Sequence, residues 1–112
     1  MMVTIQIESK GNQVFAISFS GHSGWDENGK DIVCAAISAL LQALIIGLEE
    51  VLGYSDIRQE MDLKQDNMPY IKIWIPSPYG DKQEVLVNTI TRSLKEIAKS
   101  YPDYVEISEV RI

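Results

Sequence analysis

The sequence has only one cysteine and one histidine, which excludes several common kinds of site. One cysteine cannot form a disulfide within the chain, so nothing indicates an oxidising compartment. Zinc sites normally need three or four ligands, so one Cys and one His make a poor metal site. Oxygen ligands from Asp26, Glu27 and Asp31 are the remaining alternative for a metal. We expect neither a metal ion nor a cofactor.

Positive charge is also scarce. Ten Lys and Arg residues face sixteen Asp and Glu residues, for a formal net charge of −6. This balance argues against direct binding of nucleic acid, which requires a basic surface. An acidic surface would suit a basic partner, through electrostatic steering that salt weakens. The alternative is that moderate acidity only keeps the protein soluble.

Low-complexity segments and internal repeats are absent, and the 46% hydrophobic content is typical of a folded protein. The first residues lack the basic start and apolar run of a signal peptide. The most apolar stretch, residues 32–52, is about as long as a membrane span, but Asp31, Gln42 and Glu49 lie in or beside it. Because strands are expected on both sides, we interpret it as a buried helix. We expect no membrane association and a cytoplasmic location.

Alternation of apolar and polar residues predicts two β-hairpins and a last strand. Residues 3–8 and 15–19 have a period of two, and the turn signal K-G-N lies between them. Residues 57–65 and 70–75 form the second predicted hairpin, around a turn at D-N. A final short strand is expected near residues 105–107.

Two helices complete the predicted fold. The first should begin at Asp31, a strong N-cap residue, and end at Gly53, a typical C-cap. It is apolar on nearly every side, so more than one layer or a second subunit should cover it. The second helix should span about residues 81–100. The order ββαββαβ predicts a single α+β domain over residues 1–112, with a mixed, largely antiparallel sheet packed with two helices.

The histidine and the cysteine lie in one short stretch, where His22 follows the second strand and Cys34 opens the first helix. A thiolate is a nucleophile, but an unperturbed thiol of pKa about 8.5 is mostly protonated at neutral pH. The N-terminal end of a helix stabilises the thiolate by about 0.3–1 kcal/mol, which lowers the thiol pKa by less than one unit. A nearby imidazole would supply the proton acceptor, and N–H groups at the helix start could bind an oxyanion.

Other interpretations of these residues stay open at this point. A cysteine on an apolar helix is often a small core residue, and a histidine in a polar loop is often only solvated. Asp31 could cap the helix or orient His22 as the third member of a catalytic set, and its position favours the cap. The glycines of residues 20–30 do not match a phosphate-binding pattern.

The motif G-H-S at residues 21–23, followed by G-K-D-I-V-C-A-A-I-S at residues 29–38, resembles the signature of the ribosomal-processing cysteine protease family, Prp. That signature has G-H-A, a short gap, and then G-x-D-I-V-C-A-A-V-S. Ser23 and Ile37 replace the usual alanine and valine, and neither change alters the proposed chemistry. The chain length and element order are also similar to the family.

The resemblance implies a cysteine endopeptidase that removes a short N-terminal extension from a large-subunit ribosomal protein, which is a basic substrate. His22 would be the general base and Cys34 the nucleophile, with Asp31 and Ser38 in supporting roles. The family's loop between the two is thought to order over substrate, and here it would span residues 23–30.

The residues expected to form or flank this substrate loop are Gly21, Ser23, Gly24, Trp25 and Gly29. The resemblance also implies a homodimer, which would help to cover the apolar first helix. An alternative from a different class of function is a non-enzymatic, ribosome-associated binding module in which Cys34 is a structural core residue.

Overall fold

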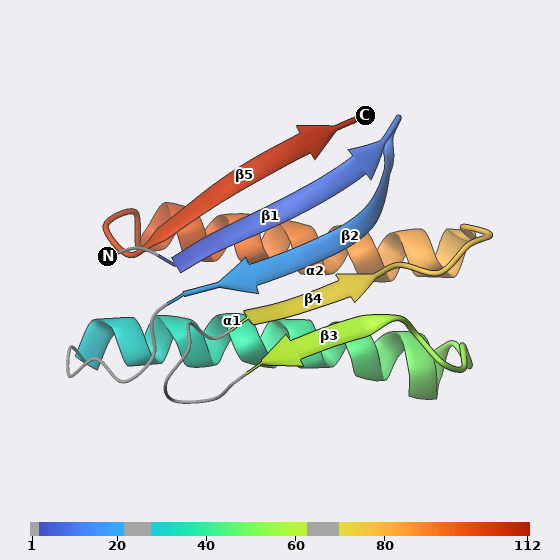
Figure 1. Cartoon of the computed structure of the whole chain (residues 1–112), viewed down its shortest axis with the longest axis horizontal. Coiled ribbons are helices and arrows are strands. Elements are labelled where there is room, and N and C mark those ends of the chain that lie inside the picture. The colour runs from blue at the N-terminus through green and yellow to red at the C-terminus, as the bar shows by residue number, and fades with distance from the viewer. Residues whose placement is uncertain (1–2, 22–27, 63–69) are drawn as a thin grey trace.

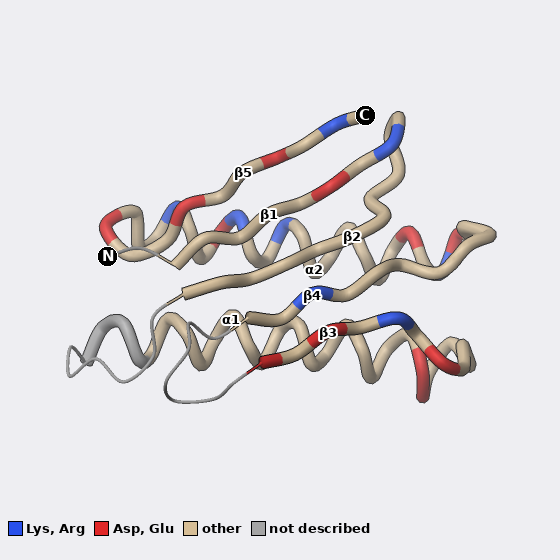
Figure 2. The backbone as a smooth tube through the Cα atoms, viewed as in Figure 1, with Lys and Arg blue, Asp and Glu red and all other residues tan. Residues whose placement is uncertain are grey.

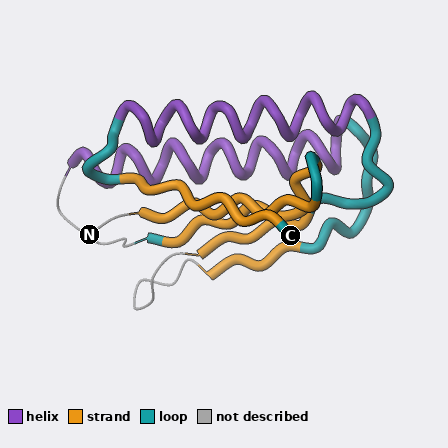
Figure 3. The backbone as a smooth tube through the Cα atoms, turned by 90° about the horizontal axis from the view of Figure 1, so that it is seen from above, coloured by secondary structure: helices purple, strands orange, loops and turns teal. Residues whose placement is uncertain are grey.

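In a computed structural model, the described residues are 3–21, 28–62 and 70–112, with only the backbone described for 28–31. They form a five-stranded sheet with two helices side by side over one of its faces (Figure 1, Figure 3). The strands are β1 (Val3–Lys10), β2 (Gln13–Ser20), β3 (Gln59–Asp62), β4 (Tyr70–Trp74) and β5 (Val105–Arg111). The helices are α1 (Asn28–Ile46), its π-helical continuation η1 (Gly47–Val51) and α2 (Asp81–Ser100). This confirms the α+β class and the order ββαββαβ.

The sheet is mixed and largely antiparallel, as predicted. Its strand order is β3-β4-β2-β1-β5, and only the β1–β5 pair is parallel. Gly11 closes the β1–β2 hairpin with a φ of 59°, in the left-handed region that favours glycine. β3 begins at Gln59, two residues later than expected, while its expected end at residue 65 and the predicted turn at Asp66-Asn67 lie outside the described residues.

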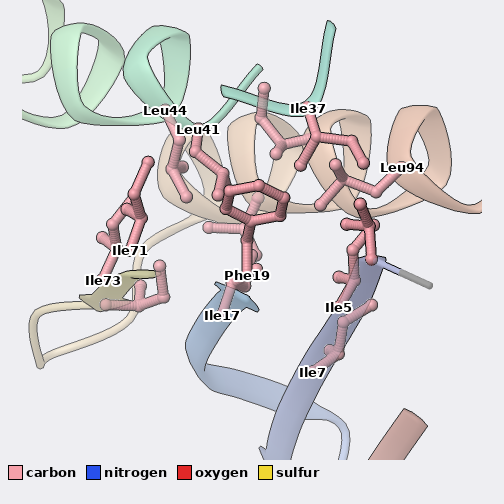
Figure 4. Packing of buried hydrophobic residues seen from close by; sticks show 14 of the residues in the cluster. Ile5, Ile7, Ile17, Phe19, Ile37, Leu41, Leu44, Ile71, Ile73 and Leu94 are labelled. Atoms are coloured by element: carbon pink, nitrogen blue, oxygen red, sulfur yellow. The ribbon is translucent and has the colours of Figure 1, made fainter. Parts of the chain in front are cut away.

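The hydrophobic core lies between the inner face of the sheet and the two helices. Phe19 reaches from β2 toward Ile37 and Leu41 of α1, and Leu94 of α2 closes the same region (Figure 4). All four side chains are at most 1% exposed. The period-two residues of the strands therefore meet the helical residues in one layer, as the sequence pattern requires.

Helix α1 ends where the sequence predicts but begins earlier. Gly53 has a φ of 82°, and the Tyr54 N–H donates a 2.9 Å hydrogen bond to the Leu48 carbonyl, which closes the helical segment. At the other end, α1 begins at Asn28 and not at Asp31. The prediction that Asp31 caps this helix is therefore wrong.

The combined segment Ile32–Val51 is long and apolar enough to cross a membrane by length and composition. In the structure, one side of it lies on the sheet, and Val33 and Leu44 are at most 1% exposed. The opposite side leaves Ile32, Ile46 and Val51 exposed by 62%, 50% and 76%. The sheet and α2 together cover this segment in the described part of the chain, except on the side that carries these three residues.

Candidate active site

The candidate site lies at one end of the molecule, where the chain passes from the sheet to α1. β2 ends at Ser20, Gly21 follows as a buried residue, and α1 begins at Asn28. The end of β2 and the start of α1 lie at the same end of the fold (Figure 1). The segment with the histidine and the cysteine therefore joins the two layers.

Gly21 is required by close packing against the first strand. A Cβ atom at this position would lie 2.9 Å from Cγ2 of Val3 and 3.4 Å from its Cα. Val3 has no room to withdraw, because it is fully buried and its N–H donates a 2.8 Å hydrogen bond to the Tyr104 carbonyl. The absence of a side chain at Gly21 thus lets the chain leave the sheet tightly against β1, one residue before His22.

Cys34 lies on α1 and is half-buried, where it packs against the edge of the hydrophobic core. Ser38 is also half-buried, four residues later and so on the same side of the helix. Neither residue is fully buried, and Cys34 both contacts the hydrophobic core and keeps part of its surface exposed.

The expected place of Cys34 in the first helical turn is wrong. Counted from Asn28, Cys34 is the seventh residue of α1. Only the first four N–H groups of a helix lack partners, and the helix dipole acts mainly within the first turn. The helix start therefore contributes little to a thiolate at Cys34, and its backbone N–H is not among those that could bind an oxyanion. The predicted activation of Cys34 therefore depends on the imidazole of His22 and not on the helix start.

The remaining predicted site residues divide into two groups. His22, Ser23, Gly24 and Trp25 lie outside the described residues, as do the alternative metal ligands Asp26 and Glu27. Gly29 and Asp31 belong to α1 by their backbone, so the expected loop to Lys30 gives way to helix at Asn28. The pairing of His22 with Cys34 therefore stays a prediction. In residues 3–21, 28–62 and 70–112, no group of three or more His, Cys, Asp or Glu could hold a metal ion.

Comparison with known proteins identifies the class. The family model described as Cysteine protease Prp matches residues 2–106. The ribosomal processing cysteine protease Prp of Mycoplasma genitalium is 35% identical over 90 residues, which is 80% of this chain and 82% of that protein. The protein of the same name from Staphylococcus aureus strain Mu50 is 25% identical over 108 residues, 96% of this chain and 98% of that protein.

The fold agrees with solved structures of similar length. The crystal structure of SMU.848 from Streptococcus mutans has a TM-score of 0.83 at 24% identity, covering 99% of this chain and 96% of that one. The ribosomal processing protease Prp from S. aureus, in complex with a substrate peptide, has a TM-score of 0.75 at 22% identity, covering 96% and 99%.

The protein is thus a cysteine protease, as its sequence motif predicts. It belongs to the Cysteine protease Prp family. The alternative of a non-enzymatic binding module is accordingly set aside.

Proposed function

We propose that this protein is an endopeptidase that removes a short N-terminal extension from a large-subunit ribosomal protein, with Cys34 as its nucleophile. One observation carries the choice of residue: the chain belongs to a family of cysteine proteases and has a single cysteine. The relatives are named ribosomal processing proteases, which supports the substrate class.

The proposed reaction is acyl transfer. His22 accepts the proton of the Cys34 thiol, and the thiolate sulfur attacks the scissile carbonyl carbon. The carbon–nitrogen bond breaks, and the leaving amine takes the proton from the His22 imidazolium. Water then hydrolyses the thioester, which regenerates the thiol and releases the new carboxyl end.

Two features of the structure support this assignment. The close packing of Gly21 on Val3 fixes the point at which the chain leaves the sheet, immediately before His22. The half-buried position of Cys34 leaves part of its surface open to a substrate. Since Asp31 does not begin the helix, orientation of His22 is the supporting role that remains for it. Ser38 lies on the same side of α1 as Cys34 and is assigned a supporting role there.

The remaining parts of the proposal concern the setting of the enzyme. The exposed apolar side chains Ile32, Ile46 and Val51 support a homodimer, because a second copy would cover them. The net charge of −6 supports encounter with a basic ribosomal protein, and added salt should slow that encounter. The proposed location is the cytoplasm, and the substrate contacts are assigned to the segment between His22 and α1, including Trp25.

The direct test is cleavage of a ribosomal protein that carries the N-terminal extension, with the cut site read by mass spectrometry. Cys34→Ala and His22→Ala should each abolish cleavage with the fold retained. Ala39→Ser, on the exposed side of the same helix, is the matched control and should cleave normally. Cleavage by Cys34→Ala would show that the proposed nucleophile is wrong.

A further inference from the structure

A polar cavity lies away from Cys34, where the β1–β2 turn and the last residues of β5 form a wall together with α2. Figure 1 shows this turn and the end of β5 at the opposite end of the molecule from the start of α1. The volume of the cavity is about 210 Å³. The walls come from β1, the β1–β2 turn, α2 and β5, so elements distant in sequence form it together. Nothing in the proposed proteolysis uses this cavity.

The cavity begins where the inner face of the sheet changes from apolar to polar. Along the parallel β1–β5 pair, Ile5 is paired with Ile107, Ile7 with Glu109, and Ser9 with Arg111. Because side chains alternate between the two faces of a sheet, all of these share the face under α2. The inward-facing side chains of β1 and β5 are therefore apolar near the core and become charged or hydroxyl-bearing further along the strands, beneath α2.

Helix α2 adds positive charge from above. Arg92 and Lys95 line the cavity three residues apart, on one side of the helix. Lys95 Nζ lies 2.8 Å from Glu109 Oε1, and this hydrogen bond, together with the charges of Lys95 and Arg111, holds the pKa of Glu109 below its usual value. Figure 2 shows Lys and Arg along α2 and at the end of β5.

The charges that line the cavity do not cancel. Arg92, Lys95 and Arg111 contribute three positive charges and Glu109 one negative charge, so the lining carries a net charge of +2 in a chain whose net charge is −6. An ion pair that served only stability would need one cation for its carboxylate. Two guanidinium groups stand in excess of that pair.

We propose that this cavity binds a phosphate group, either as free phosphate or as the terminal phosphate of a small phosphomonoester. Such a group carries a charge of about −1.5 to −2 at neutral pH, which matches the lining. Guanidinium groups bind phosphate oxygens in pairs, and the Asn12 amide and Ser9 hydroxyl add donors. The volume is below the roughly 300–1,000 Å³ of sites for drug-sized ligands, so the phosphate enters while the rest of the ligand stays in solvent.

Titration calorimetry of the purified protein with inorganic phosphate and with adenosine monophosphate tests this proposal. Arg92→Gln and Arg111→Gln should each weaken binding by about tenfold, because each removes a charge-assisted pair of hydrogen bonds. Glu109→Gln should strengthen binding, because it raises the charge of the lining. Lys99→Gln, on the exposed last turn of α2, is the control and should leave binding unchanged.

The variants change exposed side chains, and the opposite effect expected for Glu109→Gln separates recognition of an anion from damage to the fold. Binding of both probes indicates a site for the phosphate itself, and binding of the nucleotide alone indicates a phosphomonoester. No saturable binding at millimolar phosphate or nucleotide would overturn the proposal. So would equal losses in Arg92→Gln and Lys99→Gln, or binding only to an RNA oligonucleotide without terminal phosphates.

Discussion

Replacement of Gly21 by serine should destabilise the fold by an amount that the contact with Val3 determines. The new Cβ would lie 2.9 Å from Val3 Cγ2, well inside ordinary contact distance. Val3 is fully buried, and its N–H donates a hydrogen bond to the Tyr104 carbonyl, so a shift of Val3 would itself cost folding free energy. Forcing extra atoms into such packing costs about 1–3 kcal/mol. With an m-value of about 1.5 kcal/mol/M, a cost of about 2 kcal/mol lowers the urea midpoint by about 1.3 M.

A double-mutant cycle tests whether this contact is the cause. Val3→Ala removes the clashing methyl group and alone should cost about 2 kcal/mol through lost burial and a cavity. In the double variant, the serine side chain occupies the space that the Val3 methyl groups leave. The loss in free energy of unfolding should therefore be about 1 kcal/mol smaller than the sum of the two single losses. Gly80→Ser is the matched control, since a Cβ there meets nothing within 4 Å and serine is a good residue at the start of α2. Strictly additive losses, or no loss in Gly21→Ser, would refute the reasoning.

Two further predictions concern the region where β4 leads into α2. Gln83 is 1% exposed, accepts a 2.7 Å hydrogen bond from the Tyr54 hydroxyl and donates to the Pro76 carbonyl, so Gln83→Leu should cost about 1–3 kcal/mol in urea unfolding. Thr89→Val, which removes an exposed hydroxyl, is its control. Equally small losses of unfolding free energy in Gln83→Leu and Thr89→Val would contradict the role of Gln83. Burial, with the nearby charge of Glu84, raises the pKa of Tyr79 to about 12. The stability that Tyr79 contributes is therefore complete below pH 10 and is lost as the pH rises toward 12, and an absorbance titration should show one tyrosine ionising late unless Tyr79 is replaced by Phe.

Much of the fold could be predicted because its signals are local. Gly80 and Pro102 bracket α2, and the helix spans Asp81–Ser100 as expected. Gly53 marks the end of the first helical segment, and its positive φ is the reason that glycine stands there. Ile57 misled the prediction of β3, because its side chain is buried without belonging to the strand, which begins at Gln59. Periodicity reports burial and not hydrogen-bonded pairing.

The parts that could not be predicted depend on contacts between distant residues. The motif places Gly21 beside the predicted substrate loop, but glycine is needed there for its packing on Val3, which no local pattern contains. The cap preference of aspartate predicts a helix start at Asp31, but α1 begins three residues earlier, at Asn28, and its first turn contains Asp31. The charged cavity depends on α2 crossing over Glu109 and Arg111. The sequence predicts only a short last strand near residues 105–107, whereas β5 continues to Arg111 and pairs with β1 along its length.

The proposal that Cys34 is a nucleophile activated by His22 can be tested by measuring the rate of Cys34 alkylation by iodoacetamide as a function of pH. Because the chain has one cysteine, every adduct detected by mass reports on that residue. We expect rapid modification of the folded protein below pH 7, and a shift of the pH profile in His22→Ala toward that of an ordinary thiol, with pKa about 8.5. Identical profiles for the two proteins, or a cysteine that reacts only after unfolding, would show that His22 does not activate Cys34.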